Sequence, residues 1–160
     1  MKETKKSVEQ VQKKRTARDY HYSVGRHKES VARVRLYQEV KEGLTWGEHA
    51  VSKERILVNL MPIGKYFPGD VAKANYEAPL KLVNSVNKFA FSVKVAGGGK
   101  KGQLVAVVKG IARVVAGEDI DKYRLILKKA GLLTRDPRVR ERRMVGTGGK
   151  SRRQKQSPKR

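Results

Sequence analysis

Residues 88–115 read KFAFSVKVAGGGKKGQLVAVVKGIARVV, and they give the strongest indication of the fold. Apolar side chains alternate with polar or small ones over 88–95, which is the period of a half-buried strand. Three glycines at 97–99 break the pattern. From Leu104 to Val115 the spacing becomes helical, although the β-branched residues there also suit a strand and Gly110 costs about 1 kcal/mol in a helix interior. Because one apolar stripe persists through the segment, we predict a strand followed by a helix.

Upstream residues extend this unit. Residues 32–36 alternate apolar side chains with Arg33 and Arg35, which predicts a strand with a basic outer face. Residues 56–58 read ILV and predict a second, short strand. Two strands followed by helices, then a third strand followed by helices, predict an α+β fold.

Proline, aspartate and glycine predict where the helices begin and end. Pro62 opens a short helix that Pro68-Gly69 stops. Asp70 caps a helical stretch through Tyr76, and Pro79 starts another through Val86. Asp119 or Asp121 caps a last helix, which ends at Gly131.

Charge divides the chain into three parts. The 160 residues carry 38 Lys and Arg against 15 Asp and Glu, a net charge of +23. Residues 1–20 have net charge +4, residues 21–134 have +10, and residues 135–160 have +9. Neither end can bury enough apolar surface to offset its ordering entropy, so we expect a disordered basic N-terminal extension at 1–20 and an extended basic C-terminal arm at 135–160. Residues 21–134 form the globular body, and the excess charge indicates a polyanionic partner.

Composition also excludes several classes. The chain has no Cys, which fits a reducing compartment and removes thiol catalysis and thiolate metal sites. No apolar run approaches the roughly 20 residues that span a bilayer. The N-terminus MKETKKSVEQ has no apolar block, so we expect neither a signal peptide nor a transit peptide.

Two glycine-rich segments suggest phosphate binding. Residues 146–151 read GTGGKS and superficially resemble a nucleotide-binding loop, but the full pattern requires Gly where Met144 stands. We interpret this segment as a basic stretch. Gly97, Gly98 and Gly99 precede Lys100 and Lys101, and such a loop cradles a phosphate through backbone N–H groups. The alternative is a plain connection between strand and helix; the adjacent lysines favour a nucleic-acid phosphate.

Histidine chemistry is the remaining enzymatic alternative. His21, His27 and His49 lack the spacing of metal ligands on one helix face, and no pair of carboxylates lies in an apolar setting. A nuclease could use His21 or His27 with Asp19 or Glu29. We favour His27 as one member of a basic cluster, and predict no catalytic residue, no metal site and no cofactor.

The C-terminal arm points to RNA. Eleven of its 26 residues are basic, eight of them Arg. Guanidinium groups bridge phosphate oxygens bidentately and stack on bases, which ammonium groups do not. An Arg-rich arm that folds on structured RNA is the economical interpretation, and charge alone leaves DNA open.

Several segments in order resemble one family. Residues 25–34 read GRHKESVARV, residues 56–59 read ILVN, residues 78–80 read APL, residues 95–103 read VAGGGKKGQ, residues 127–136 read LKKAGLLTRD, and the chain ends Lys159-Arg160. These segments are similar to the universal small-subunit ribosomal protein nine family in its bacterial form, over roughly 22–160. Residues 1–20 have no counterpart in that form, and 38–53, with Trp46, is longer than the usual loop.

The resemblance implies a fold and partners. The fold would be a small mixed sheet with helices on one face, of the ribosomal protein domain-2-like type with a left-handed βαβ crossover. The partners would be the rRNA of the small-subunit head, neighbouring head proteins and the anticodon arm of P-site tRNA. The protein would be cytoplasmic and ribosome-bound, with no membrane contact and no homo-oligomer. The alternative is a non-ribosomal basic DNA- or RNA-binding protein.

Motif by motif, the resemblance and the basic clusters assign site residues. The tRNA-binding residues are Lys159 and Arg160. The rRNA-binding residues are Arg26, His27, Lys28, Arg33, Gly97, Gly98, Gly99, Lys100, Lys101, Arg135, Arg138, Arg140, Arg142, Arg143, Lys150, Arg152, Arg153 and Lys155.

Overall fold

A five-stranded mixed sheet forms the centre of the molecule. The computed structural model describes residues 20–38, 45–46, 49–50, 56–86 and 88–149. The strands lie in the order β1 (His21–His27), β2 (Ser30–Tyr37), β7 (Ala90–Ala96), β5 (Ile56–Val58) and β6 (Met61–Pro62). All neighbours are antiparallel except β5 and β7, which are parallel. A separate two-stranded ribbon pairs β3 (Thr45–Trp46) with β4 (His49–Ala50).

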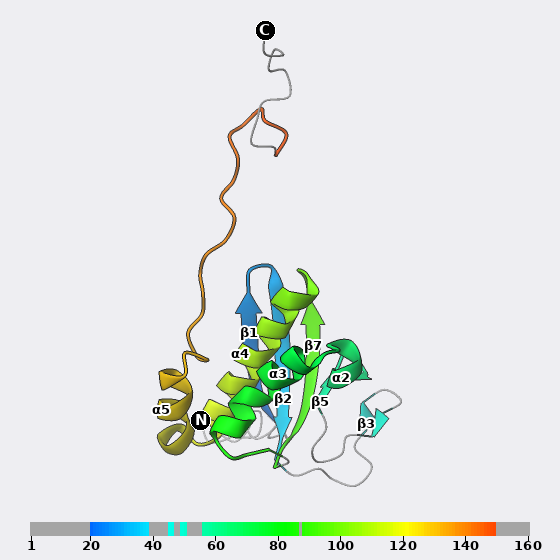
Figure 1. Cartoon of the computed structure of the whole chain (residues 1–160), viewed down its shortest axis with the longest axis vertical. Coiled ribbons are helices and arrows are strands. Elements are labelled where there is room, and N and C mark those ends of the chain that lie inside the picture. The colour runs from blue at the N-terminus through cyan, green and yellow to red at the C-terminus, as the bar shows by residue number, and fades with distance from the viewer. Residues whose placement is uncertain (1–19, 39–44, 47–48, 51–55, 87, 150–160) are drawn as a thin grey trace, which may run out of the picture.

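Helices cover one face of this sheet. They are α2 (Ile63–Tyr66), α3 (Asp70–Leu82) and α4 (Lys100–Glu118), whereas α5 (Ile120–Lys129) packs against α4 and α3. Figure 1 shows α4 lying across β1 and β2, with α3 beside it on the same face. The α+β prediction is confirmed. No helix in the described part of the chain is long and apolar enough to span a membrane.

The core lies between α4 and the sheet. Along β2, Ala32, Val34 and Leu36 are fully buried while the two arginines between them are exposed, so the predicted alternation is confirmed. The facing side of α4 contributes Val107 and Ile111 to the same cluster. The predicted strand–glycine–helix unit is therefore present, with its helix longer at both ends than the apolar stripe alone indicated.

The second face of β7 is also partly buried, which the alternation did not predict. Ala90 and Ser92 are only 0% and 2% exposed although they point away from the helices. Leu57 and Ala90 form a small cluster on this side, and Tyr37 and Trp46 pack against it. β7 lies between β2 and β5, so neighbours on both sides cover its outer face.

Several elements differ from the sequence prediction. Residues 70–82 form one helix that continues through Pro79, rather than two helices, because Pro79 is buried with Leu80 in the core and tertiary packing outweighs the missing hydrogen bond. That helix ends at Leu82 and its N-cap is Gly69, not Asp70. β1 was missed because its sequence, HYSVGRH, lacks an apolar alternation.

The last helix and the segment after it follow the expected signals. The Asp119 side chain accepts a hydrogen bond from the Lys122 N–H, and Gly131 has φ +72°, so the predicted cap and stop are confirmed. Residues 135–144 then run without helix or strand. In Figure 1 this segment leaves the body and extends beyond the turn between β1 and β2. The expected extension at 1–20 lies almost wholly outside the described residues.

Candidate nucleic-acid interface

The glycine-rich loop between β7 and α4 packs against the turn between β1 and β2. Gly97 and Gly98 have φ of +76° and +62°, in the left-handed region. A Cβ on Gly97 would lie 2.3 Å from the Glu29 carbonyl oxygen, and one on Gly98 would lie 2.2 Å from Ser30 Oγ. The Ser30 hydroxyl donates a hydrogen bond to the Gly97 carbonyl (3.2 Å). These two glycines are therefore required by packing, whatever they bind.

A hydrogen-bond network behind the loop holds it in place. Val95 N–H donates to Asn59 Oδ1 (2.8 Å), and Asn59 Nδ2 donates to the Val95 carbonyl (3.0 Å). The Tyr66 hydroxyl donates to Gln103 Oε1 (2.9 Å), whose amide nitrogen donates to the Gly97 carbonyl (3.0 Å). The chain of contacts ties β5, α2 and α4 to the loop, so the loop is preorganised.

Two lysines stand at the first turn of α4. Gly99 caps this helix without a side-chain hydrogen bond, and no acidic residue lies in its first turn. The helix dipole places partial positive charge there. Lys100 Nζ lies 3.5 Å from the centroid of the Tyr66 ring, which fixes the ammonium group by a cation–π contact. Lys101 is exposed. Beside them is a cavity of about 380 Å³ lined by Tyr66, Phe67, Pro68, Ala72, Lys100, Lys101 and Leu104.

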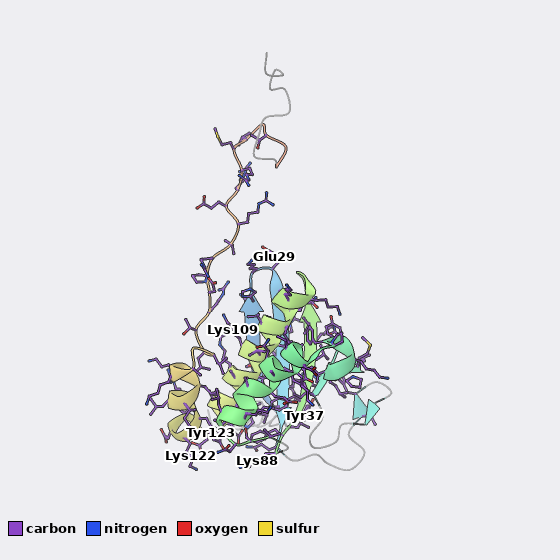
Figure 2. All side chains as sticks on the ribbon, viewed as in Figure 1. Glu29, Tyr37, Lys88, Lys109, Lys122 and Tyr123 are labelled. Carbon is purple, nitrogen blue, oxygen red and sulfur yellow. The ribbon has the colours of Figure 1, made fainter. Side chains whose placement is uncertain are left out.

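The β1–β2 turn brings more basic groups to the same end of the body. Arg26 and Lys28 are exposed. His27 is half-buried instead, and its ring lies against the first turn of α4, where a Cβ on Gly102 would be 3.8 Å from His27 Cδ2. Figure 2 shows Glu29 at this turn, at the end of the body that the loop also occupies. Of the basic cluster Arg26-His27-Lys28, the structure thus presents the first and the last residue as exposed cations.

Arg33 lies on the open face of the sheet. It points from β2 away from the helices, directly opposite Lys94 of β7. A hollow of about 380 Å³ on this side is lined by Arg26, Glu29, Val31, Arg33, Lys94, Ala96 and Gly97. Arg33 therefore shares a surface with Arg26 and with the first glycine of the loop, whereas Lys100 and Lys101 do not line this hollow.

The arm arginines lie along the extended segment. Arg135, Arg140, Arg142 and Arg143 are exposed, and the side chains of this segment project outward from the chain in Figure 2. Arg138 is held by Asp136 in a bidentate pair, with Nη2 2.7 Å from Oδ2 and Nε 2.9 Å from Oδ1. The side-chain hydrogen bond from Arg138 lowers the pKa of Asp136 well below its ordinary value. The remaining site residues fall outside the described part of the chain: Lys150, Arg152, Arg153, Lys155, Lys159 and Arg160.

The structure does not assemble the alternative sites. His21 and His27 stand at opposite ends of β1, about 20 Å apart at the usual rise of a strand. His21 Nε2 lies 3.2 Å from Glu118 Oε2, a partner that the nuclease hypothesis did not name. Within the described residues no group of three His, Asp or Glu side chains could hold a metal ion.

The GTGGKS segment also lacks the surroundings of a nucleotide-binding loop. The residues before it form no strand, and its described part is a turn in which the Thr147 hydroxyl donates to the Met144 carbonyl (2.8 Å). The interpretation as a basic stretch is retained.

Sequence reasoning missed the residues that position the loop. Asn59 and Gln103 lie within the family-like segments 56–59 and 95–103, but the sequence assigned no role to them or to Tyr66. Asn59 has φ +46°, which a run of ILVN does not reveal. The usable signals were these segments and an amide residue directly after an apolar strand.

Known proteins resemble the chain over most of its length. The family model described as Ribosomal protein S9/S16 matches residues 25–160. The small ribosomal subunit protein uS9 of Maridesulfovibrio salexigens is 40% identical over 133 residues, covering 83% of this chain and 92% of that protein. The uS9 of Solidesulfovibrio magneticus is 40% identical over 131 residues, covering 82% and 90% respectively. The matched range includes the loop, the network behind it and the whole arm, and the chain belongs to the ribosomal protein S9 family.

Proposed function

We propose that the protein binds the rRNA of the small-subunit head through its loop end and its C-terminal arm, and that the arm tip contacts P-site tRNA. The observation that carries this proposal is the arm itself. Five arginines lie within residues 135–143, on an extended segment that leaves the body. Of these five arginines, only Arg138 forms an ion pair with a carboxylate of the described residues.

Such a segment suits a phosphate backbone. Cations closely spaced on an extended chain repel one another in the free protein, and rRNA phosphates relieve that repulsion while releasing counterions. Arginine adds bidentate contacts and stacking on unpaired bases. Contacts with RNA, rather than contacts with the body of the protein, therefore offset the entropy that the arm loses when it becomes ordered.

The loop end supplies a second contact on the same partner. Arg26 and Lys28 at the β1–β2 turn and Lys100 and Lys101 at α4 lie at the same end of the body, because the loop packs on the turn. The network around Gln103 keeps these cations at constant spacing, which favours a structured RNA surface over a flexible one. We further propose that the parallel β5–β7 crossover through α2 and α3 is the left-handed βαβ unit of domain-2-like ribosomal folds.

Membership of the family gives the general role of the protein. The chain is a structural protein of the small ribosomal subunit and not an enzyme. We propose a cytoplasmic, ribosome-bound location, without homo-oligomers. The exposed Leu125 and Ile126 of α5 offer apolar contact area to neighbouring head proteins.

A deletion at the tip tests the division of labour between arm and tip. Removing Lys159 and Arg160 should weaken P-site tRNA binding by purified subunits and leave the yield of assembled subunits unchanged, because assembly relies on the rest of the arm. As a matched control, Lys128→Gln with Lys129→Gln removes the same charge from α5 and should alter neither measurement. Equal reductions of tRNA binding and yield would contradict the division.

Sedimentation tests the ribosomal assignment against a non-ribosomal nucleic-acid-binding protein. In a lysate at low magnesium concentration the protein should migrate with small subunits. Recovery in chromosomal or free fractions would contradict the assignment and favour the alternative.

A further inference from the structure

The open face of the sheet carries an ordered array of basic and aromatic side chains. Strand register places Tyr22, Arg35 and Ser92 in one row across β1, β2 and β7. Arg33 and Lys94 stand opposite each other in the next row. The helices lie against the other face, so this array lies outside the core between α4 and the sheet. Arg33 and Lys94 also line the neighbouring hollow that reaches Arg26 and Gly97.

These rows form the floor of a hollow. Its volume is about 450 Å³, within the range of roughly 300–1,000 Å³ typical of small-ligand sites. Its lining is Tyr20, Tyr22, Arg33, Arg35, Trp46, Ser92 and Lys94. Three members are aromatic and three are cations, and none is a carboxylate. The three cations repel one another, so an anion that reached all of them would be held strongly.

Neighbouring groups hold Tyr20 and Trp46 in place. The Arg35 guanidinium carbon lies 4.9 Å from the Tyr20 ring centroid, and the Tyr20 ring lies 5.8 Å from that of Tyr37. Trp46, from the β3–β4 ribbon, packs against the cluster of Leu57 and Ala90 at the side of the hollow. Rings held in this way can stack on a base with little loss of conformational entropy.

We propose that this hollow binds an unpaired nucleotide of RNA, with the base on the Tyr22 and Trp46 rings and the phosphate on Arg33, Arg35 and Lys94. This inference rests on the proposed function in that the partner is RNA, and it adds a third contact surface. A base within a duplex is stacked on both faces, so it cannot stack on an aromatic ring of the hollow. An acidic peptide would satisfy the cations but leave the rings uncovered.

Intrinsic fluorescence provides a local readout, because Trp46 is the sole tryptophan of the chain. The full-length protein is titrated at one fixed salt concentration with hexa-adenylate, with an abasic oligomer of the same length, and with hexaglutamate. Anisotropy of end-labelled hexa-adenylate reports total binding in parallel. Hexa-adenylate should quench Trp46, whereas the other two probes should not.

Variants then locate the contact. Tyr22→Leu should raise the hexa-adenylate concentration needed for half-maximal quenching at least about five-fold, since one base–aromatic stack contributes that much or more. Arg35→Gln should act in the same direction. Lys73→Gln, which removes one exposed charge from α3, is the matched control and should leave the quenching curve unchanged.

Each outcome decides the proposal. Binding by anisotropy without Trp46 quenching would overturn the hollow as a nucleotide site and leave RNA binding by the loop end and arm intact. Equal quenching by the abasic oligomer or by hexaglutamate would make it a general anion site and overturn the base contact. Absence of binding by both readouts would contradict the hollow and the proposed RNA function together.

Discussion

At the scale of single residues, Gly25 and Gly110 mark the closest approach of α4 to the sheet. A Cβ on Gly25 would lie 1.9 Å from the Ala106 carbonyl oxygen, and one on Gly110 would lie 2.6 Å from Val34 Cγ2. Ser23 Oγ donates to the Gly110 carbonyl across this contact (2.7 Å). The close approach explains why a glycine is retained in a helix interior despite its propensity cost.

Two glycines of the same helix should therefore respond in opposite ways to alanine. Gly110→Ala should lower the free energy of unfolding by roughly 1–3 kcal/mol, because the added methyl overpacks a buried contact. Gly117→Ala, whose Cβ would meet nothing within 4 Å, should raise it by up to about 1 kcal/mol. Urea unfolding of both variants measures the two changes. Stabilisation by both would mean that α4 can move away from β1.

The pair between Asp136 and Arg138 makes a second prediction at this scale. The hydrogen bonds from Arg138 lower the pKa of Asp136 below its ordinary value of 3.8. A lowered carboxyl pKa means that the pair persists as pH falls through 4 and is broken only in stronger acid. In Arg138→Gln, NMR titration of the Asp136 carboxyl should give a pKa close to 3.8. Arg140→Gln is the control and should leave the low value in place.

At the scale of elements, the Asn59 side chain continues a strand that has ended. β5 stops at Val58, yet the Asn59 amide both accepts from Val95 N–H and donates to the Val95 carbonyl, as a strand backbone would. The Asn59 N–H itself donates to the Val93 carbonyl (2.9 Å). The glycine-rich loop therefore begins at a defined point, although its neighbouring strand is only three residues long.

Removing this amide should destabilise the protein. Asn59→Ala leaves both polar groups of Val95 without their partner, and alanine tolerates φ +46° less well than asparagine. We expect the free energy of unfolding to fall by about 2–3 kcal/mol in urea. Asn75→Ala, at an exposed position of α3, is the matched control and should cause no destabilisation. A decrease below about 0.5 kcal/mol in Asn59→Ala would show that water replaces the amide.

At the scale of the whole molecule, charge is separated from the core. The body buries its apolar residues between α4 and the sheet, while the described part of the arm, residues 135–149, places its arginines outside. Binding through such an arm is dominated by counterion release. The affinity of the arm for RNA should therefore depend strongly on salt concentration.

The salt dependence of rRNA binding tests this separation. Substituting Arg135, Arg142 and Arg143 by Gln should reduce the logarithmic salt slope by about 0.7–0.9 for each phosphate that the variant no longer neutralises, measured by filter binding to a transcript of the small-subunit head rRNA. The control substitutes Lys73, Arg124 and Lys128 by Gln, which removes the same charge from exposed helix positions. An equal change of slope in both triple variants would mean that net charge, rather than the arm, governs binding.

Local pattern determined much of this protein. The alternation in β2, the period of α4, the cap at Asp119 and the family motifs could be read from neighbouring residues, because periodicity and capping depend on side chains a few positions apart. The excess of positive charge likewise indicated a polyanionic partner without any coordinates.

Tertiary structure decided what depends on residues far apart in the chain. Asn59 lies 36 positions from Val95, and Ser23 lies 87 from Gly110. Packing carried α3 through Pro79 and turned His27 toward α4. It also placed Arg33 in one hollow with Arg26 and Gly97. Such contacts leave no periodic trace, because their free energy comes from surfaces that meet only after the chain has folded.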